Sequence, residues 1–356
     1  MALWQTSDAQ GETASLSRWD TSRIPASYWA MAAVLLLLPA VSSDFVIVQI
    51  FARSLIYGMI ALSLMFVGGY GGMVSLAQLA IAGVAGYMTA ILGPSAITTI
   101  SLVWPWWLYI PAAILIATLF GTITGALAVR TAGIYTIMIT LAIATAFFYF
   151  VRQNYVVFNG FQGFNQVQPP QLFGIDWRGP IAFYYLVAFW AVAAYLVVLY
   201  VARAPFGLAL QGVRDNPRRM AALGFNVTAH RVAAYTFASV IAAVAGILLV
   251  WLNNGISPGA VAVGPAIDIL VIAVVGGLKH PIGPFIGALI YVLLRTFALD
   301  VLTAVGLDPH RFQLLIGLGF LAIVFWSSDG VLGLWQRWRS YQGRVDPLTG
   351  LPREGR

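Results

Sequence analysis

The sequence predicts an all-α polytopic membrane protein with about ten transmembrane helices, and three observations predict it. Apolar residues make up 60% of the 356 residues and charged residues only 9%, a composition that water-soluble globular domains do not have. Many apolar runs approach the roughly 20 residues that a helix needs to cross a bilayer. These runs lack the short alternating segments of a β-barrel, so helices are expected to satisfy the backbone in lipid.

The predicted crossings follow one another along most of the chain. In order they cover residues 28–42, 46–67, 74–92, 106–128, 134–151, 180–202, 232–252, 266–278, 282–298 and 312–326. The segments at 28–42 and 266–278 are short for a crossing, so the count is approximate. Together the crossings define a transmembrane domain at 28–326, between an amino-terminal tail at 1–27 and a carboxyl-terminal tail at 327–356.

The longest internal polar segment, residues 203–231, holds five arginines and a single acid, Asp215. Short basic loops resist translocation, which places this loop in the cytoplasm. The predicted crossings before the loop and those after it are even in number, so both tails are expected on the cytoplasmic side as well. Membrane orientation and anionic headgroups explain the excess of positive charge at segment ends, so nucleic acid is not an expected partner.

A short helix is predicted within this loop, over residues 217–224. Asp215 and Asn216 are suited to cap the helix, Pro217 to its first position, and Gly224 to its end. Four residues give the helix a small apolar surface: Met220, Ala221, Ala222 and Leu223. A helix with such a surface outside the bilayer is suited to docking on another protein. The alternative is a solvated, charged connector without a partner.

Two glycine-bearing breaks, at residues 68–72 and 276–283, interrupt the predicted crossings. Such breaks are tolerated in a membrane only where protein or a cavity satisfies the backbone. The sequences Val67-Gly68-Gly69 and Val275-Gly276-Gly277 each precede a further apolar segment. This pattern indicates a candidate internal repeat around a central pathway. Chance use of glycine in membrane helices is the alternative.

Four polar residues in or beside the crossings are candidates for lining a transport pathway: Ser75, Gln78, Asn253 and Asp268. Ser75 and Gln78 are three positions apart and are expected on one helix face, with plain interhelical hydrogen bonding as the alternative. Asn253 is expected at the outer end of a crossing. Asp268 is expected near a helix start, where interaction with the helix dipole or free amides is the simpler explanation.

The remaining polar and aromatic segments are assigned to the membrane surface. Residues 153–179 form the largest predicted external loop, a candidate contact for a soluble binding protein, with an ordinary surface loop as the alternative. The aromatic residues Trp104, Trp106, Trp107 and Tyr109 predict an interfacial belt.

The sequence holds no catalytic, metal or cofactor pattern. The histidines are scattered without metal-ligand spacing, cysteine is absent, and no Walker A motif occurs. We therefore expect a transport protein that is no enzyme and uses no cofactor. Its crossings are nearly free of ionisable residues, which argues against an ion-coupled secondary transporter. A channel would leave the helix in the basic loop unexplained.

Several segments resemble the branched-chain amino acid permeases of ABC importers, of the LivM type. They are the glycine-rich break with its Ser-x-x-Gln segment, RTAGIYTIMITLA from Arg130, RDNPRRMAALGFNV from Arg214, GGLKHPIGPFIGAL from Gly276, and the ending IVFWSSDGVLGLW from Ile323. The resemblance extends over most of the chain, from about Leu55 to Leu334.

The basic loop is similar to the "EAA" coupling loop of such permeases, whose helix sits in a cleft of a cytoplasmic ATPase. The resemblance implies these ATPase-coupling residues: Arg214, Asp215, Asn216, Pro217, Ala221, Ala222, Leu223 and Gly224. Asp215 departs from the glutamate that is common there, and Lys279-His280-Pro281 occupies a usually neutral turn.

The function that the resemblance implies is that of a permease subunit in a binding-protein-dependent ABC importer, working by alternating access in the bacterial inner membrane. ATP would be hydrolysed on separate ABC ATPase subunits. The other implied partners are a second related permease, a periplasmic substrate-binding protein and membrane lipid. Branched-chain amino acids are the expected solutes, but similar permeases move urea or short amides, which leaves the solute open.

Overall fold

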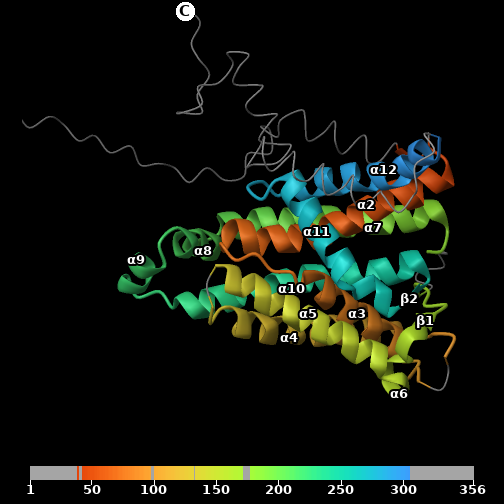
Figure 1. The fold of residues 1–356 in the computed structure, drawn as a ribbon, viewed down its shortest axis with the longest axis horizontal. Coiled ribbons are helices and arrows are strands. Elements are labelled where there is room, and N and C mark those ends of the chain that lie inside the picture. Colours follow the sequence, from red (N-terminus) through yellow and green to blue (C-terminus); the bar gives the residue numbers. More distant parts are fainter. Residues whose placement is uncertain (1–37, 40–41, 98–99, 132, 171–176, 305–356) are drawn as a thin grey trace, which may run out of the picture. The chain divides into compact units, whose positions relative to one another are not determined.

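The structure is a computed structural model that describes residues 38–39, 42–97, 100–131, 133–170 and 177–304. The chain divides into two compact units, residues 1–42 and 43–356. All elements described below belong to the second unit, which is mainly helical (Figure 1).

Five segments of the described chain are helical, long and apolar enough to cross a membrane. They are Val46–Tyr70, α4 (Trp106–Ala128), α5 (Ile134–Gln153), α7 (Pro180–Arg203) and α10 (Val227–Asn253). The first is a continuous run of the π-helix η2 (Val46–Ala52), α2 (Arg53–Met65) and the π-helix η3 (Phe66–Tyr70). Three further apolar helices accompany them: α3 (Gln78–Leu92), α11 (Val263–Gly276) and α12 (Gly283–Ala304), which is counted as a shorter apolar helix over Gly283–Phe297.

The predicted crossings between residues 46 and 298 each coincide with one of these helices. The predicted crossing at 312–326 and the carboxyl-terminal tail lie outside the described residues, as do the amino-terminal tail and nearly all of 28–42. The multi-pass helical architecture is therefore observed, whereas the count of ten crossings, the domain limits and the internal repeat stay predictions.

The long helices differ sharply in how much of their surface is buried. The most apolar window of Val46–Tyr70 is 78% buried and that of α10 is 61% buried, whereas those of α4, α5 and α7 are only 22–28% buried. The helices α2 and α10 contact each other, and α10 also packs along α3 and α4. Apolar residues on α4, α5 and α7 remain exposed, as expected for helices that face lipid.

Small residues bring α10 close to its neighbours. A Cβ atom added at Gly246 of α10 would meet the backbone carbonyl of Ala82 on α3. On α4, Gly121 and Gly125 leave room for side chains of α10, Ser239 and Tyr235 respectively. Close packing over small residues is the usual way in which membrane helices associate, because lipid supplies no hydrophobic driving force between them.

The two ends of α10 carry different substructures (Figure 1). Two short helices, α8 (Pro205–Asp215) and α9 (Pro217–Ala222), precede α10 and project beyond the long helices. At its other end, β2 (Gly255–Ile256) pairs antiparallel with β1 (Phe164–Asn165), with Phe164 opposite Ile256. The turns α6 (Tyr155–Phe158), η4 (Gly160–Gln162) and η5 (Pro258–Val261) complete this end.

The two predicted loops at 153–179 and 203–231 contain more regular structure than expected. Much of the predicted external loop at 153–179 is built onto the end of α10, where the Val167 N–H also donates to the Asn254 carbonyl at 3.2 Å. The predicted basic loop at 203–231 contains α8 in addition to the expected short helix. Neither the pairing of β1 with β2 nor the presence of α8 follows from local sequence patterns.

Candidate functional site

The helix α9 begins at a defined cap. Asn216 is the N-cap residue, and its Oδ1 accepts a hydrogen bond from the Arg219 backbone N–H at 3.0 Å. Pro217 occupies the first helical position, where its missing N–H costs nothing. Asp215 does not cap the helix: it ends α8, and its carboxylate accepts from Nε of Arg214 at 2.8 Å. The predicted start of the helix is confirmed, with Asn216 alone as its cap.

The same helix ends in a Schellman motif. Gly224 has φ of +89°, in the left-handed region that favours glycine. The Phe225 N–H donates to the Met220 carbonyl at 3.1 Å, and the Gly224 N–H donates to the Ala221 carbonyl at 3.0 Å. Local hydrogen bonds therefore close both ends of α9, and the predicted role of Gly224 in ending the helix is confirmed.

The surface of α9 is available for contact. None of its residues is buried, and Leu223, directly after it, is 67% exposed. Phe225 is 40% exposed and meets the His230 ring edge-on, with 5.6 Å between centroids. His230 in turn stacks on Phe206 of α8 at 5.8 Å. Sequence reasoning missed this aromatic cluster, although an aromatic residue next to the helix-ending glycine was visible.

Arg214 connects this segment directly to the first glycine break, which in turn contacts the second. Its Nη1 donates to the Gly69 carbonyl at 2.6 Å, and its aliphatic stem covers Gly72, where an added Cβ would come within 2.7 Å of the Arg214 Cγ. Gly69 also lies against the Leu278 carbonyl of the second break, leaving no space for a Cβ atom. The loop and the two breaks, which are distant in sequence, therefore meet at one place.

Ser75 and Gln78 do not share a helix face, and this expectation is wrong. The left-handed backbone of Gly72, with φ of +70°, interrupts the helix, and α3 begins only at Gln78. Ser75 lies before the helix, and its Oγ accepts from the Ala77 N–H at 3.3 Å. Gln78 is fully buried and its Oε1 accepts from the Ser63 Oγ of α2 at 3.2 Å. Gln78 thus makes an interhelical hydrogen bond, and a pathway role for either residue stays a prediction.

Asn253 and Asp268, in contrast, line the same cavity. The volume of this cavity is about 200 Å³. Its polar wall combines Tyr57 of α2, Asn253 of α10, Asp268 of α11, and Tyr291 and Arg295 of α12. Four helices therefore bring polar side chains to one point within a largely apolar bundle.

The position of Asp268 within α11 differs from the expected one. The helix begins at Val263, directly after the turn η5, so Asp268 lies in its second turn and not beside the free amides of the first. Its carboxylate instead accepts a hydrogen bond from the Tyr291 hydroxyl of α12, and Arg295 lies close enough to interact with it electrostatically. The expected interaction of Asp268 with the start of its helix is therefore wrong.

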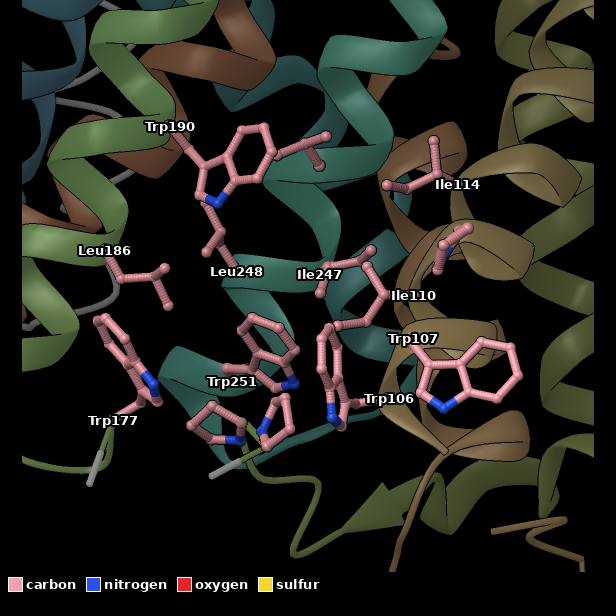
Figure 2. Close-up of a pocket in the computed structure, with 14 residues that line it drawn as sticks. Trp106, Trp107, Ile110, Ile114, Trp177, Leu186, Trp190, Ile247, Leu248 and Trp251 are labelled. Atoms are coloured by element: carbon pink, nitrogen blue, oxygen red, sulfur yellow. The ribbon is translucent and has the colours of Figure 1, made fainter. Parts of the chain in front are cut away.

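A second cavity, of about 330 Å³, is apolar (Figure 2). It lies between α4, α7 and α10, and tryptophans dominate its lining: Trp106, Trp107, Trp177, Trp190 and Trp251. Trp104, Trp106 and Trp107 are 38–61% exposed, as the predicted interfacial belt requires. Tyr109 was predicted in the same belt but is only 2% exposed, because it lies on the inner side of α4.

Among the described residues, no group of three histidine, aspartate or glutamate side chains is placed to hold a metal ion. The polar side chains that line the cavity beside Asp268 can form hydrogen bonds and charge pairs.

Comparison with known proteins gives matches over most of the chain. The family model described as "Branched-chain amino acid transport system / permease component" matches residues 46–324. The chain is 24% identical over 340 residues to the high-affinity branched-chain amino acid transport system permease protein LivM of Salmonella typhimurium, covering 88% of this chain and 76% of that protein. The protein of the same name from Escherichia coli is 24% identical over 326 residues, covering 84% and 74%.

A third relative matches over a shorter part of the chain. The probable branched-chain amino acid transport permease protein LivM of Methanocaldococcus jannaschii is 24% identical over 227 residues, covering 62% of this chain and 63% of that protein. No solved structure gives a significant match to the chain.

Proposed function

The chain belongs to the family of permease components of branched-chain amino acid transport systems, and we propose that it is the membrane subunit of a binding-protein-dependent ABC importer. It is a multi-pass transport permease, in keeping with its apolar helices and its relatives. The proposal adds the energy source: ATP is hydrolysed on separate subunits that dock on α9.

The observation that carries the proposal is the construction of α9. A six-residue helix without tertiary burial would not persist by itself, because short helices are marginal in water. Here an N-cap at Asn216 and a Schellman motif at Gly224 stabilise it, and Leu223 is held exposed beside it. A fixed, exposed helix of this kind is suited to insertion into a cleft of a partner.

The contacts behind α9 supply a route for movement into the membrane domain. The helix α8 joins α9 to α7, and Arg214 at its end holds the Gly69 carbonyl of the first glycine break. When the ATPase pair closes, its clefts would move α9, and this movement would reach the two breaks through α8. The helices on either side would then rotate and expose the pathway alternately to each side of the membrane.

The proposed assembly contains two ABC ATPases, a second related permease and a periplasmic substrate-binding protein. In it, α9 and both chain termini face the cytoplasm of a bacterial inner membrane. The names of the relatives favour branched-chain amino acids as solutes. Urea or short amides are the alternative solutes within the same class of importer.

The introduction of an acidic side chain on the exposed surface beside α9 tests the proposal. Leu223 is 67% exposed, so Leu223→Asp should affect folding little. Docking of the ATPase subunits on α9 should fail, because the new acidic side chain lies in the docking surface. Burying the exposed two thirds of a leucine contributes about 1–2 kcal/mol, and burying a carboxylate costs more, so affinity for the ATPases should fall more than tenfold. Val156→Asp is the matched control, because Val156 is 83% exposed at the opposite end of the bundle.

The readouts are co-purification of the ATPase subunits and stimulation of ATP hydrolysis by the loaded binding protein. Both should be lost in Leu223→Asp, while ATPase co-purification should persist in Val156→Asp. Retention of both by Leu223→Asp would show that α9 does not carry the coupling contact.

Ion-coupled secondary transport is a second candidate function, and Asp268 is the observation that favours it. Secondary transporters often have a carboxylate within the membrane that faces a neighbouring helix. Asp268 is such a residue, because it lies on α11 and lines a cavity together with side chains of α12. This function predicts that the chain alone, reconstituted in sealed vesicles, accumulates leucine when an ion gradient is imposed. The importer proposal predicts no gradient-driven uptake by the chain alone.

A further inference from the structure

Opposite charges face one cavity in the membrane domain. Asp268 on α11 and Arg295 on α12 both line the polar cavity, which has a volume of about 200 Å³. Ionisable residues within membrane segments are costly and are usually paired or functional. Among the described side chains, these two do not form the close ion pair that joins Arg214 to Asp215. The carboxylate and the guanidinium are therefore both available to a third charged group.

Uncharged polar groups complete the surroundings of Asp268. The Tyr291 hydroxyl donates to its carboxylate and so orients it. Asn253 of α10 and Tyr57 of α2 line the same cavity, and each side chain carries an oxygen atom. An ammonium group has three donors and no acceptor, so a carboxylate with neighbouring amide and hydroxyl oxygens suits it. A guanidinium such as that of Arg295 suits a carboxylate, which it can bind through two parallel hydrogen bonds.

The size of the cavity selects a small solute. Its volume of about 200 Å³ is below the range of about 300–1,000 Å³ that drug-sized ligands occupy. Leu249, Ile269 and Ile272 form an apolar part of the wall. The cavity thus offers an acid, a base and an aliphatic surface within the dimensions of a single amino acid.

We propose that this cavity is a solute site that recognises the zwitterionic part of an α-amino acid, with Asp268 receiving the ammonium group and Arg295 the carboxylate. The aliphatic wall then receives the side chain. Urea and short amides carry neither charge and can engage the two residues only through hydrogen bonds without charge pairing, which are weaker, so the site favours amino acids over these alternative solutes. The inference rests on the proposed transport function, which it extends by naming the cavity and the residues that bind the solute.

The location of the cavity fits delivery from outside. Asn253 is the last residue of α10, and α9 adjoins the first. The 27 residues of α10 span about 40 Å, so the cavity lies near the end of the bundle opposite α9. In the proposed topology this is the side at which a binding protein would release its solute.

Protection of Asp268 from chemical modification tests the site without requiring transport. The purified full-length chain is treated with a carbodiimide, which modifies carboxyl groups, and the modification of Asp268 is followed by mass spectrometry with and without leucine. Leucine should slow the modification of Asp268 but not that of Asp215, which is exposed at the far end of the bundle. 4-Methylpentanoate and isopentylamine, which each lack one charged group of leucine, should protect much less well.

Substitutions test whether Arg295 binds the carboxylate of leucine. Arg295→Gln should raise the leucine concentration that gives half protection by about tenfold or more, as expected for loss of a hydrogen-bonded charge pair. Arg152→Gln is the matched control, because Arg152 lies outside the cavity, and it should leave protection unchanged. If Asp268 resists the reagent, the Kd for radiolabelled leucine is measured in the same variants and in Asp268→Asn. Arg295→Gln and Asp268→Asn should then raise the Kd, and Arg152→Gln should leave it unchanged.

The results separate this inference from the importer proposal. Absence of leucine protection in the native chain, or equal protection by the amine and the acid, would overturn the assignment of the cavity. Normal leucine uptake by a complete transporter carrying Asp268→Asn and Arg295→Gln would also overturn it. A failure of ATPase subunits to co-purify would instead contradict the importer proposal and leave leucine protection unaffected.

Discussion

Arg214 is the direct connection between the α8–α9 segment and the first glycine break, so its replacement tests how this contact stabilises the membrane domain. Arg214→Met keeps an aliphatic stem over Gly72 but removes the hydrogen bond from Nη1 to the Gly69 carbonyl, which is 2.6 Å long. A hydrogen bond from a charged donor contributes about 1.5–3 kcal/mol. Because the Arg214 side chain is 39% exposed, solvent screening reduces this to about 1 kcal/mol.

Asp215→Ala is the control that separates this hydrogen bond from the adjacent ion pair. The Asp215 side chain is 66% exposed, and such a surface pair contributes only about 0–1 kcal/mol. The control variant loses the pair but retains the bond between Arg214 and Gly69. We therefore expect a clear effect of Arg214→Met and little effect of Asp215→Ala.

Amide hydrogen exchange of the purified full-length chain measures the difference. The Gly72 N–H donates to the Gly68 carbonyl and the Met73 N–H to the Val67 carbonyl, both at 3.1 Å, so these amides report opening of the break. A loss of about 1 kcal/mol should speed their exchange about fivefold in Arg214→Met. Unchanged exchange in Arg214→Met, or an equal effect of Asp215→Ala, would refute the stabilising role of the contact.

Two further predictions concern the backbone of the same regions. Gly69→Ala should destabilise the protein by about 1–3 kcal/mol, because the new methyl group would overlap the Leu278 carbonyl. Gly264→Ala, where the added Cβ meets open space, is its control in thermal unfolding, and equal melting temperatures would contradict the close contact. Asn226→Ala removes the N-cap of α10, whose Oδ1 accepts from a backbone N–H at 3.0 Å. It should cost about 1 kcal/mol and speed amide exchange in the first turn of α10, whereas Asn226→Asp should retain the cap.

Local patterns were sufficient for the elements that depend on local chemistry. Apolar runs of membrane length located the helices between residues 46 and 298. The order Asn216, Pro217 and Gly224 located the start and end of α9, because caps are made by side chains and amides a few residues apart. The expectations for Ser75 and Asp268 were wrong because the predicted helix starts were wrong. The helix α3 begins at Gln78 and α11 begins at Val263, a few residues from the predicted starts.

The sequence by itself determined that this chain is an apolar, multi-pass helical protein with a short capped helix in a basic segment, because composition, run length and capping are properties of neighbouring residues. Only the tertiary structure decided which distant groups meet. The hydrogen bond from Arg214 to Gly69 spans 145 positions, and the cavity combines side chains from four helices. Such contacts depend on how helices pack and rotate against one another, and no periodicity along the chain encodes that.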